Sequence, residues 1–214
     1  MNWYQRVFVP RLLNAEMSSK ELEQIRRVVL MDAVGTVLEI GVGPGYNIPL
    51  YQNIAKLYAL DPSKELMKIA KTRAGSRPFP IEFLNTGAEN IPLPDHSVDT
   101  VVSTWTLCSV LDPKKVLREI QRVLQPQGHF IFVDHGASPN LFLRVIQTGL
   151  TVIAKYLTGN CHYDRKLEEF IREAGFHIER IEHPRTRFKP LVYNYQGVAI
   201  PSFCMDPTDV RQSK

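Results

Sequence analysis

The fold of this chain is decided by residues 37–47, which read VLEIGVGPGYN. A short apolar run, Val37 to Ile40, leads into glycines at positions 41, 43 and 45. Because glycine has no Cβ, such a turn lets the backbone bend tightly and approach a ligand. Dinucleotide-binding folds also begin with a strand and a glycine-rich turn, and a purely structural turn is the other alternative. The stretch therefore predicts a buried strand that ends in a turn suited to a ligand.

The position of the third glycine separates this turn from a dinucleotide-binding turn. Tyr46 stands where a GxGxxG pattern has its third glycine, and the third glycine is instead Gly45. Asp61 follows directly after the next apolar run. A carboxylate at the end of the second strand is suited to accept both hydroxyl groups of a ribose. A structural turn before Pro62 is the alternative explanation for Asp61.

On both sides of this turn, apolar runs alternate with helical patterns. A helical arm is predicted at 2–31, strands at 36–40, 56–60, 81–85, 98–104 and 129–134, helices at 63–73 and 113–124, and a turn at 125–128. Further helices are predicted at 139–157 and 165–174, and further strands at 176–182 and 191–200. Short apolar strands separated by helices indicate a parallel sheet covered on both faces. No repeat or linker interrupts the pattern, so we expect residues 1–214 to form a single domain.

Composition and charge narrow the classes of partner. The 214 residues include 26 basic and 22 acidic side chains, a formal net charge of +4. This mild excess permits contact with an anionic membrane or an acidic substrate, but no basic run or aromatic-basic stripe predicts a nucleic-acid partner. The best apolar stretches, 100–111 and 145–154, are shorter than the roughly 20 residues that a membrane-spanning helix needs. No signal peptide is recognisable at the start, and the oligomeric state is not indicated.

The three cysteines, Cys108, Cys161 and Cys204, show no CxxC spacing. Their number and spacing predict neither a disulfide framework nor a metal site. A reducing, cytoplasmic location with optional contact at a membrane surface fits this pattern.

Four sequence pieces, taken in order, carry a resemblance to a known family. They are LEIGVGPG (38–45), ALDPS (59–63), GAENIPLPDHSVDTVVS (87–103) and REIQRVLQPQGHFIFVDHG (118–136). With these pieces, residues 37–135 resemble the S-adenosylmethionine-binding core of class I methyltransferases, of the type 11 subgroup. The resemblance implies a seven-stranded, mainly parallel sheet with helices on both faces, a Rossmann-like α/β fold whose last strand is antiparallel. It divides the domain into an N-terminal arm or lid (1–31), a cofactor-binding core (36–135) and acceptor-side helices with the final strands (136–214).

The same resemblance assigns the cofactor site residue by residue. Its members are Glu39, Gly41, Gly43 and Gly45 around the methionine part, Asp61 at the ribose, Ala88 and Glu89 beside the adenine, and Thr104 near the methionyl amine. Asp99 belongs to the same motif but begins the fourth strand, so we expect a structural role for it.

Residues beyond the carboxyl ends of the fourth and fifth strands are the candidates for the acceptor pocket. Methyl transfer from a sulfonium is an in-line displacement in which alignment supplies much of the acceleration, so a dedicated acid–base pair is not required. Trp105 and Cys108 follow the fourth strand, and His135, whose titration range suits a base, follows the fifth. His162 is a further substrate-binding candidate. Simple packing of Trp105, an inert core thiol at Cys108 and a polar turn at His162 are the structural alternatives.

Outer motifs indicate a narrower relationship. YQRVFVPRLL (4–13), STWTLCSV (103–110), VDHG (133–136) and GNCHYDR (159–165) are similar to the animal membrane-associated thiol methyltransferases and their bacterial relatives. This similarity implies a small-molecule acceptor, and a thiol suits the site because a pKa of about 8.5 leaves some thiolate at neutral pH. The alternatives are a phospholipid-amine or quinone-precursor methyltransferase, a nicotinamide-dependent oxidoreductase, and a non-catalytic cofactor-binding protein at a membrane surface.

Two segments are expected to cover the site. The arm carries Trp3, Val7 and Leu12 and is predicted to be a lid, an interfacial helix or a packing helix. The helix at 139–157 has apolar residues at 142, 145, 146, 149, 150, 153 and 157, a stripe that predicts a buried face over the active site.

Overall fold

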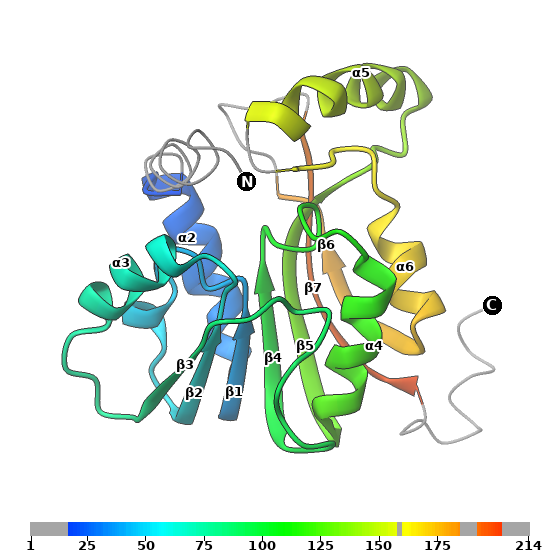
Figure 1. The fold of residues 1–214 in the computed structure, drawn as a ribbon. Helices are drawn as coiled ribbons and strands as arrows, with labels where there is room; N and C mark the ends of the chain where they lie inside the picture. Colours follow the sequence, from blue (N-terminus) through cyan, green and yellow to red (C-terminus); the bar gives the residue numbers. More distant parts are fainter. Residues whose placement is uncertain (1–16, 158–159, 185–191, 203–214) are drawn as a thin grey trace.

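The computed structural model describes residues 17–157, 160–184 and 192–202. One seven-stranded sheet runs through the molecule (Figure 1). Its strands are β1 (Gly35–Ile40), β2 (Ile54–Leu60), β3 (Ile81–Leu84), β4 (Val98–Thr104), β5 (Leu124–Gly136), β6 (Phe176–Glu182) and β7 (Tyr193–Pro201). The helices are α2 (Lys20–Val29), α3 (Lys64–Ala74), α4 (Pro113–Val123), α5 (Leu141–Leu157) and α6 (Leu167–Glu173), with short 3-10 turns at Leu30–Asp32 and Ile48–Leu50.

The strand order in the sheet is β3-β2-β1-β4-β5-β7-β6. β1 pairs in parallel with both β2 and β4, β2 pairs in parallel with β3, and β4 with β5. β7 enters between β5 and β6 and is antiparallel to both. The predicted seven-stranded sheet with an antiparallel last strand is therefore confirmed.

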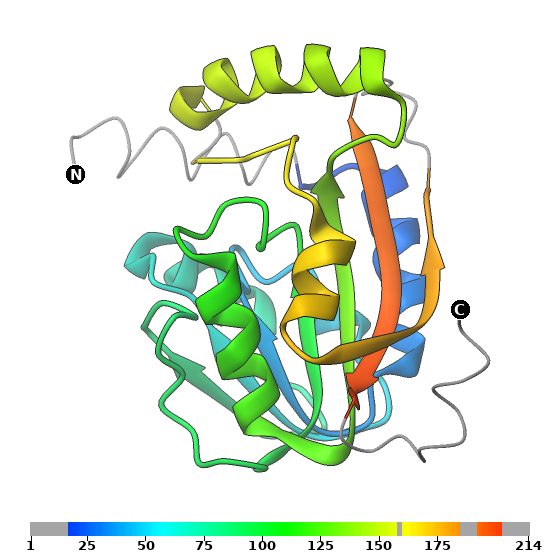
Figure 2. The same cartoon turned by 90° about the vertical axis from the view of Figure 1, so that its right-hand side faces the viewer.

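Alternate residues of the central strands enter two separate cores. Val37, Val102 and Ile131 pack on the face that carries α2 and α3, whereas Leu38 and Val101 pack on the face that carries α4 and α6. Figures 1 and 2 show these two pairs of helices on opposite sides of the sheet. Adjacent strand residues point to opposite faces, so a continuous apolar run is what a sheet covered on both sides requires.

Helix starts follow the expected capping chemistry. The Ser63 hydroxyl accepts a hydrogen bond from the Leu66 amide at the start of α3. Asp112 caps α4 in the same way by accepting from the Lys115 amide, and Pro113 occupies the first helical position. These caps satisfy amide groups that the helix leaves without partners, and they place the loops after β2 and β4 at fixed points.

α5 lies across the carboxyl ends of the strands, as Figures 1 and 2 show. The prediction that its apolar stripe is buried was wrong for the first half of the helix, where Phe142 is 74% and Val145 67% exposed. Further along the stripe, Leu150 packs against a buried cluster that includes Cys108 and Cys161. The buried side chains include polar Gln147, whose carbonyl oxygen accepts from the Ser138 amide and whose amide donates to the Gly136 carbonyl. The main-chain groups at the end of β5 need hydrogen-bond partners once α5 covers them, and a polar inner face supplies these partners.

The turn predicted at 125–128 is part of β5. Leu124 pairs with Val98, and the next pair along the ladder is His129 with Thr100. Residues 125–128 therefore form an irregularity within the strand, where the register of β5 against β4 shifts. The turn-forming residues were recognised correctly, but their effect is a bulge within one strand.

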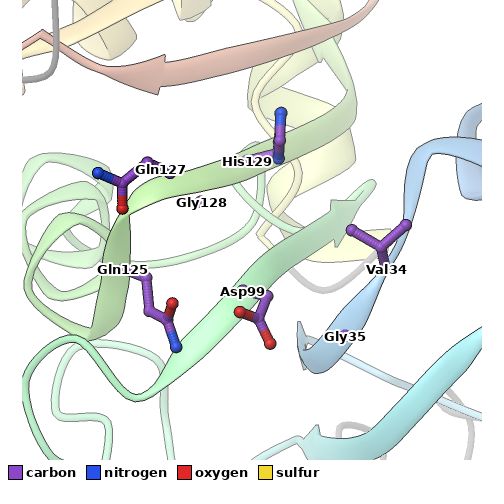
Figure 3. A pocket seen from close by; sticks show the side chains of 7 residues that line it. All are labelled: Val34, Gly35, Asp99, Gln125, Gln127, Gly128 and His129. Atoms are coloured by element: carbon purple, nitrogen blue, oxygen red, sulfur yellow. The ribbon is translucent and has the colours of Figure 1, made fainter.

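A hollow of about 260 Å³ lies at the amino ends of β1 and β4, at the opposite edge of the sheet from the glycine turn (Figure 3). Asp99 lines it and accepts a hydrogen bond of 2.7 Å from the Thr36 amide. This bond ties the starts of the two strands together, which agrees with the structural role expected for Asp99. Among the described residues, no helix has the length and hydropathy that crossing a bilayer requires.

Candidate functional site

A cavity of about 530 Å³ opens at the carboxyl ends of β1, β2, β4 and β5. The glycine turn and the ends of these strands form its wall, together with the segment after β4 and part of the segment before α6. Of the residues predicted for the site, the cavity wall includes Glu39, Gly41, Gly43, Asp61, Ala88, Glu89, Thr104, Trp105, Cys108 and His135. Gly45 and His162 are not part of this wall. Parallel strands bring distant residues to one edge of a sheet, which is why these residues meet.

The three positions of the turn require glycine for different local reasons. All three have positive φ angles, 65° at Gly41, 54° at Gly43 and 79° at Gly45. A Cβ on Gly43 would find only the Gly41 carbonyl oxygen, at 3.8 Å, so the space beside it is open. A Cβ on Gly45 would lie 2.9 Å from Cα of Ala70 in α3. Gly43 therefore borders the cavity, whereas Gly45 lets the turn pack against a helix.

Glu39 lies at the bottom of the cavity wall and is 1% exposed. Its two carboxylate oxygens accept hydrogen bonds from the Asn47 side-chain amide at 3.0 Å and from the Tyr51 hydroxyl at 2.9 Å. Burial raises the pKa of Glu39 from 4.5 to about 8, although both hydrogen bonds oppose the shift. Glu39 is thus a carboxyl that a neighbouring cation would convert from the protonated to the ionised form at neutral pH.

Asp61 connects the end of β2 to the glycine turn. Its Oδ2 accepts a hydrogen bond of 2.9 Å from the Gly43 amide, and its Oδ1 accepts one of 2.8 Å from the Ser63 amide. Burial raises the pKa of Asp61, and the two amide hydrogen bonds oppose this rise. The structural explanation of Asp61 is thus confirmed, and because Asp61 also lines the cavity, its ligand-binding role stays a prediction.

Arg26 of α2 is a buried cation in the cavity wall that the sequence analysis missed. It is 2% exposed, and its guanidinium lies 4.9 Å from the Trp105 ring and 5.3 Å from the Tyr46 ring. Burial lowers its pKa to about 10, so the side chain stays charged at neutral pH. Its neighbour Arg27 is exposed and pairs with Glu23, and nothing in the amphipathic pattern of α2 distinguishes the two arginines.

Three buried polar atoms in the cavity wall have no hydrogen-bond partner within the described part of the chain. They are Nη2 of Arg26, Oδ1 of Asn47 and Nε1 of Trp105. Such atoms are costly to bury unless a ligand or water satisfies them. Two donors and one acceptor close to the Glu39 carboxyl form a set that suits a ligand carrying both an anionic and a cationic group.

The other end of the cavity is sulfur-rich and partly aromatic. Cys108 and Cys161 are buried, with their Sγ atoms 3.4 Å apart, and Nδ1 of His135 lies 3.4 Å from the Cys161 sulfur. The His135 ring packs against Tyr163 with 5.2 Å between ring centres. Contact with the Cys108 thiol, together with His135, lowers the pKa of Cys161 below that of an ordinary thiol. The sequence analysis named Cys108 and His135 for this region but did not select Cys161.

The segment 160–165 reaches this place by hydrogen bonds to consecutive carbonyl groups after β4. The Asn160 side chain donates to the Ser109 carbonyl, and the His162 amide donates to the Cys108 carbonyl at 2.9 Å. Arg165 donates to the carbonyl groups of Leu107 and Val110. These bonds fix Cys161 beside Cys108, while the His162 side chain faces Asp164 at 3.8 Å.

Comparison with known proteins identifies the class of this site. Residues 38–132 match the methyltransferase domain family. The chain is 33% identical over 198 residues to thiol S-methyltransferase TMT1B of Rattus norvegicus, covering 86% of this chain and 80% of the relative. It is 38% identical over 196 residues to TMT1B of Homo sapiens, covering 87% and 80%. This chain belongs to the methyltransferase family of these relatives.

The solved structures support the fold of the methyltransferase. The methyltransferase solved in complex with the Haloferax volcanii Trm112 activator superposes with a TM-score of 0.71 at 18% identity, over 94% of this chain and 99% of that one. The protein is therefore an enzyme of the S-adenosylmethionine-dependent methyltransferase class, and the oxidoreductase and non-catalytic alternatives are not supported. The cytoplasmic location and the contact with a membrane surface stay predictions.

The different surroundings of Gly43 and Gly45 give a testable contrast. We expect Gly43→Val to abolish binding of S-adenosylhomocysteine, because the branched side chain enters the open space of the cavity and strains a backbone held at positive φ. We expect Gly45→Ala to lower the free energy of unfolding by about 1–3 kcal/mol, because its Cβ meets the backbone of α3. Isothermal titration and urea unfolding measure the two effects. A Gly43→Val protein that binds normally would contradict the assigned turn.

Proposed function

We propose that this methyltransferase transfers the methyl group of S-adenosylmethionine to the sulfur of a small, apolar thiol. The observation that carries the proposal is the shape of the cavity: one continuous space joins the Glu39 and Asp61 carboxyls to the cysteine- and tyrosine-lined end. Such a space is suited to bring a polar donor and an apolar acceptor into line, and alignment of this kind is worth about 7–11 kcal/mol in favourable cases. The thiol methyltransferases matched over most of the chain support the same acceptor class.

The residues at the polar end of the cavity fit the amino-acid part of the cofactor. Arg26 and the Trp105 indole supply unsatisfied donors for a carboxylate, and Asn47 supplies an unsatisfied acceptor for an ammonium group. The Glu39 carboxyl lies 3.0 Å from the Asn47 amide and adds negative charge beside that acceptor. Thr104, which accepts a hydrogen bond from the same Asn47 amide, completes this polar end.

The remaining cofactor-binding residues keep the roles that the family resemblance implied. We assign the ribose hydroxyls to Asp61, whose carboxylate is already held in position by the Gly43 and Ser63 amides. Ala88 is buried and Glu89 accepts a hydrogen bond from the Leu111 amide, so both are fixed in the wall where we place the adenine. Bound S-adenosylmethionine supplies an electrophilic methyl group on a sulfonium.

The acceptor end is formed by Trp105, Cys108, His135, Cys161 and Tyr163. Trp105 has a positive φ of 51°, an uncommon conformation for a bulky residue, and its amide donates to the Val133 carbonyl. This backbone conformation places the indole in the wall between the two ends of the cavity. We assign His135 as the catalytic residue at the acceptor end, because it lines the cavity and contacts Cys161.

A screen of acceptors tests the thiol proposal directly. With isotopically labelled S-adenosylmethionine, we expect methylation of alkyl thiols and little transfer to phosphatidylethanolamine or to quinol precursors. A thiol with a pKa of about 8.5 supplies some thiolate at neutral pH, whereas an amine is mostly protonated there and requires a base. Faster methylation of the amine or of the quinol precursor than of every thiol would refute the proposal.

Arg26 and Arg27 form a matched pair for testing the polar end. We expect Arg26→Met to weaken S-adenosylmethionine binding by about 1.5–3 kcal/mol, because a charged hydrogen-bond donor is lost from a buried site. Arg27→Met serves as the control on the same helix, since Arg27 is exposed and bonded to Glu23. Calorimetric titration measures both variants. Equal affinities for the two would show that the cofactor carboxylate is held elsewhere.

The raised pKa of Glu39 predicts how cofactor binding depends on pH. The carboxyl of the free enzyme is largely protonated at pH 7 because its pKa is about 8. A bound ammonium group favours the ionised carboxylate, so binding releases a proton, and the affinity rises with pH up to about 8 by at most tenfold per pH unit. We expect the Kd for S-adenosylmethionine to fall between about pH 6.5 and 8, and Glu39→Gln to remove this slope. An affinity that does not change with pH in the wild-type enzyme would contradict a cationic group beside Glu39.

A further inference from the structure

The cluster formed by Cys108, His135 and Cys161 has the composition of a metal site. The ligating atoms of the three side chains all lie within 4.8 Å of one another. The two sulfur atoms are 3.4 Å apart, and Nδ1 of His135 is 3.4 Å from the Cys161 sulfur. Tetrahedral zinc, with Zn–S bonds of about 2.3 Å and Zn–N bonds of about 2.0–2.1 Å, separates its ligand atoms by roughly 3.5–3.8 Å. Two of the three separations therefore match the edges of a zinc tetrahedron, and the third, between Cys108 and His135, is at most 4.8 Å.

The surroundings of the cluster provide a second, independent observation. Asp134 is 0% exposed, and its Oδ1 accepts hydrogen bonds from the amides of both Cys108 and His135. Its Oδ2 is buried and has no partner among the described residues. Burying the Asp134 carboxylate between Cys108 and His135 costs free energy unless a cation compensates its charge. The Arg165 guanidinium interacts electrostatically with Asp134 and both cysteines, but its hydrogen bonds go to the carbonyl groups of Leu107 and Val110. A divalent cation at the cluster would add positive charge close to Asp134, and Asp134 would orient two of the three ligands in the manner of an outer-sphere partner.

Three protein ligands on a cavity wall leave the fourth corner of the tetrahedron directed to the cavity. All three residues line the same space that joins the glycine turn to the acceptor end. Structural zinc sites are closed by four protein ligands, whereas catalytic zinc sites have three and keep one position for water or substrate, and Cys₂His is one such set. Thiolate and imidazole are also the ligands that zinc prefers over hard cations.

We propose that Cys108, His135 and Cys161 bind one Zn²⁺ ion whose open position takes the acceptor thiol as a thiolate. The metal site itself stands on the cluster, and only its role in the reaction rests on the proposed thiol methylation. On zinc binding, the two cysteine thiols release their protons to solvent. The acceptor thiol likewise loses its proton on binding to the metal. Its sulfur then forms the new bond to the methyl carbon while the bond from that carbon to the sulfonium breaks. The neutral thioether product is a weak ligand and leaves the metal.

The first experiment measures metal binding without reference to activity. The full-length protein is purified under reducing conditions, stripped with a chelator and titrated with Zn²⁺ and with Co²⁺. We expect one metal ion per chain and, with Co²⁺, the thiolate charge-transfer and visible d–d bands of a tetrahedral site. Addition of an alkyl thiol is expected to change the Co²⁺ spectrum, because it enters the fourth position. No uptake of metal by the reduced protein, or a spectrum of six-coordinate Co²⁺, would overturn the proposal.

Variants locate the ion. We expect Cys108→Ser and Cys161→Ser each to weaken Zn²⁺ binding by more than about 100-fold, beyond the 10–100-fold effect of outer-sphere partners. His162→Gln is the matched control, since His162 adjoins Cys161 but lies outside the cavity wall, and it should bind Zn²⁺ as the wild type does. Circular dichroism checks that each variant folds. Undiminished binding in both serine variants would refute this location.

Three further outcomes separate the metal site from its alternatives. A disulfide between Cys108 and Cys161 in protein purified without reductant, together with no metal uptake after reduction, would replace the zinc site by a redox pair. Full thiol methylation by the stripped enzyme would overturn the role of zinc and leave the proposed function intact. Zinc binding at the cluster without any thiol turnover would leave the metal site intact and refute the proposed function.

Discussion

The structure depends on the central position of β1, which pairs in parallel with β2 on one side and β4 on the other. The chain runs outward from β1 in one direction and then returns to continue in the other, so the strand order reverses beside it. In open α/β sheets a crevice forms at the carboxyl ends of the strands where this reversal occurs. The glycine turn after β1, Asp61 after β2 and Thr104 at the end of β4 therefore meet in one cavity. Helices on both faces then bury the strands from which these residues emerge.

The polar end of the cavity combines several arrangements that are unfavourable for stability. Arg26 and Glu39 are charged or ionisable groups in a buried place, and each has its pKa shifted by burial. Trp105 has a left-handed backbone conformation. Each such feature costs of the order of 1–3 kcal/mol and persists only where surrounding contacts hold it in place. Concentrating them at one cavity is typical of a site whose geometry is set before the ligand binds.

The acceptor end is held by main-chain contacts of a late segment. Residues 160–165 follow the carbonyl groups of residues 107–110 through hydrogen bonds from Asn160, His162 and Arg165. α5 lies above and contributes polar Thr151, which accepts a hydrogen bond from the Tyr163 amide and donates to Asp164. Phe142 and Val145 on the outward side of α5 are exposed, whereas Leu150 and Ala154 pack against the cluster of Cys108, Cys161 and Tyr163. The helix therefore covers the cysteine end through hydrogen bonds together with a small apolar contact. This arrangement fixes both cysteines while the cavity between them and the glycine turn stays open.

The sequence by itself determined the alternation of strands and helices, the glycine turn and Asp61. Hydrophobic periodicity and the positions of turn-forming residues are local properties of the sequence. Accordingly, β4 and β6 have the bounds that the apolar runs predicted. Only the tertiary structure decided which arginine of α2 is buried, which face of α5 is inward, and that Cys108, His135 and Cys161 are neighbours. A helical stripe shows that one face differs from another but not what each contacts. The cysteines come together because parallel pairing joins the ends of β4 and β5 and hydrogen bonds align a distant segment with them, and spacing along the chain does not encode such contacts.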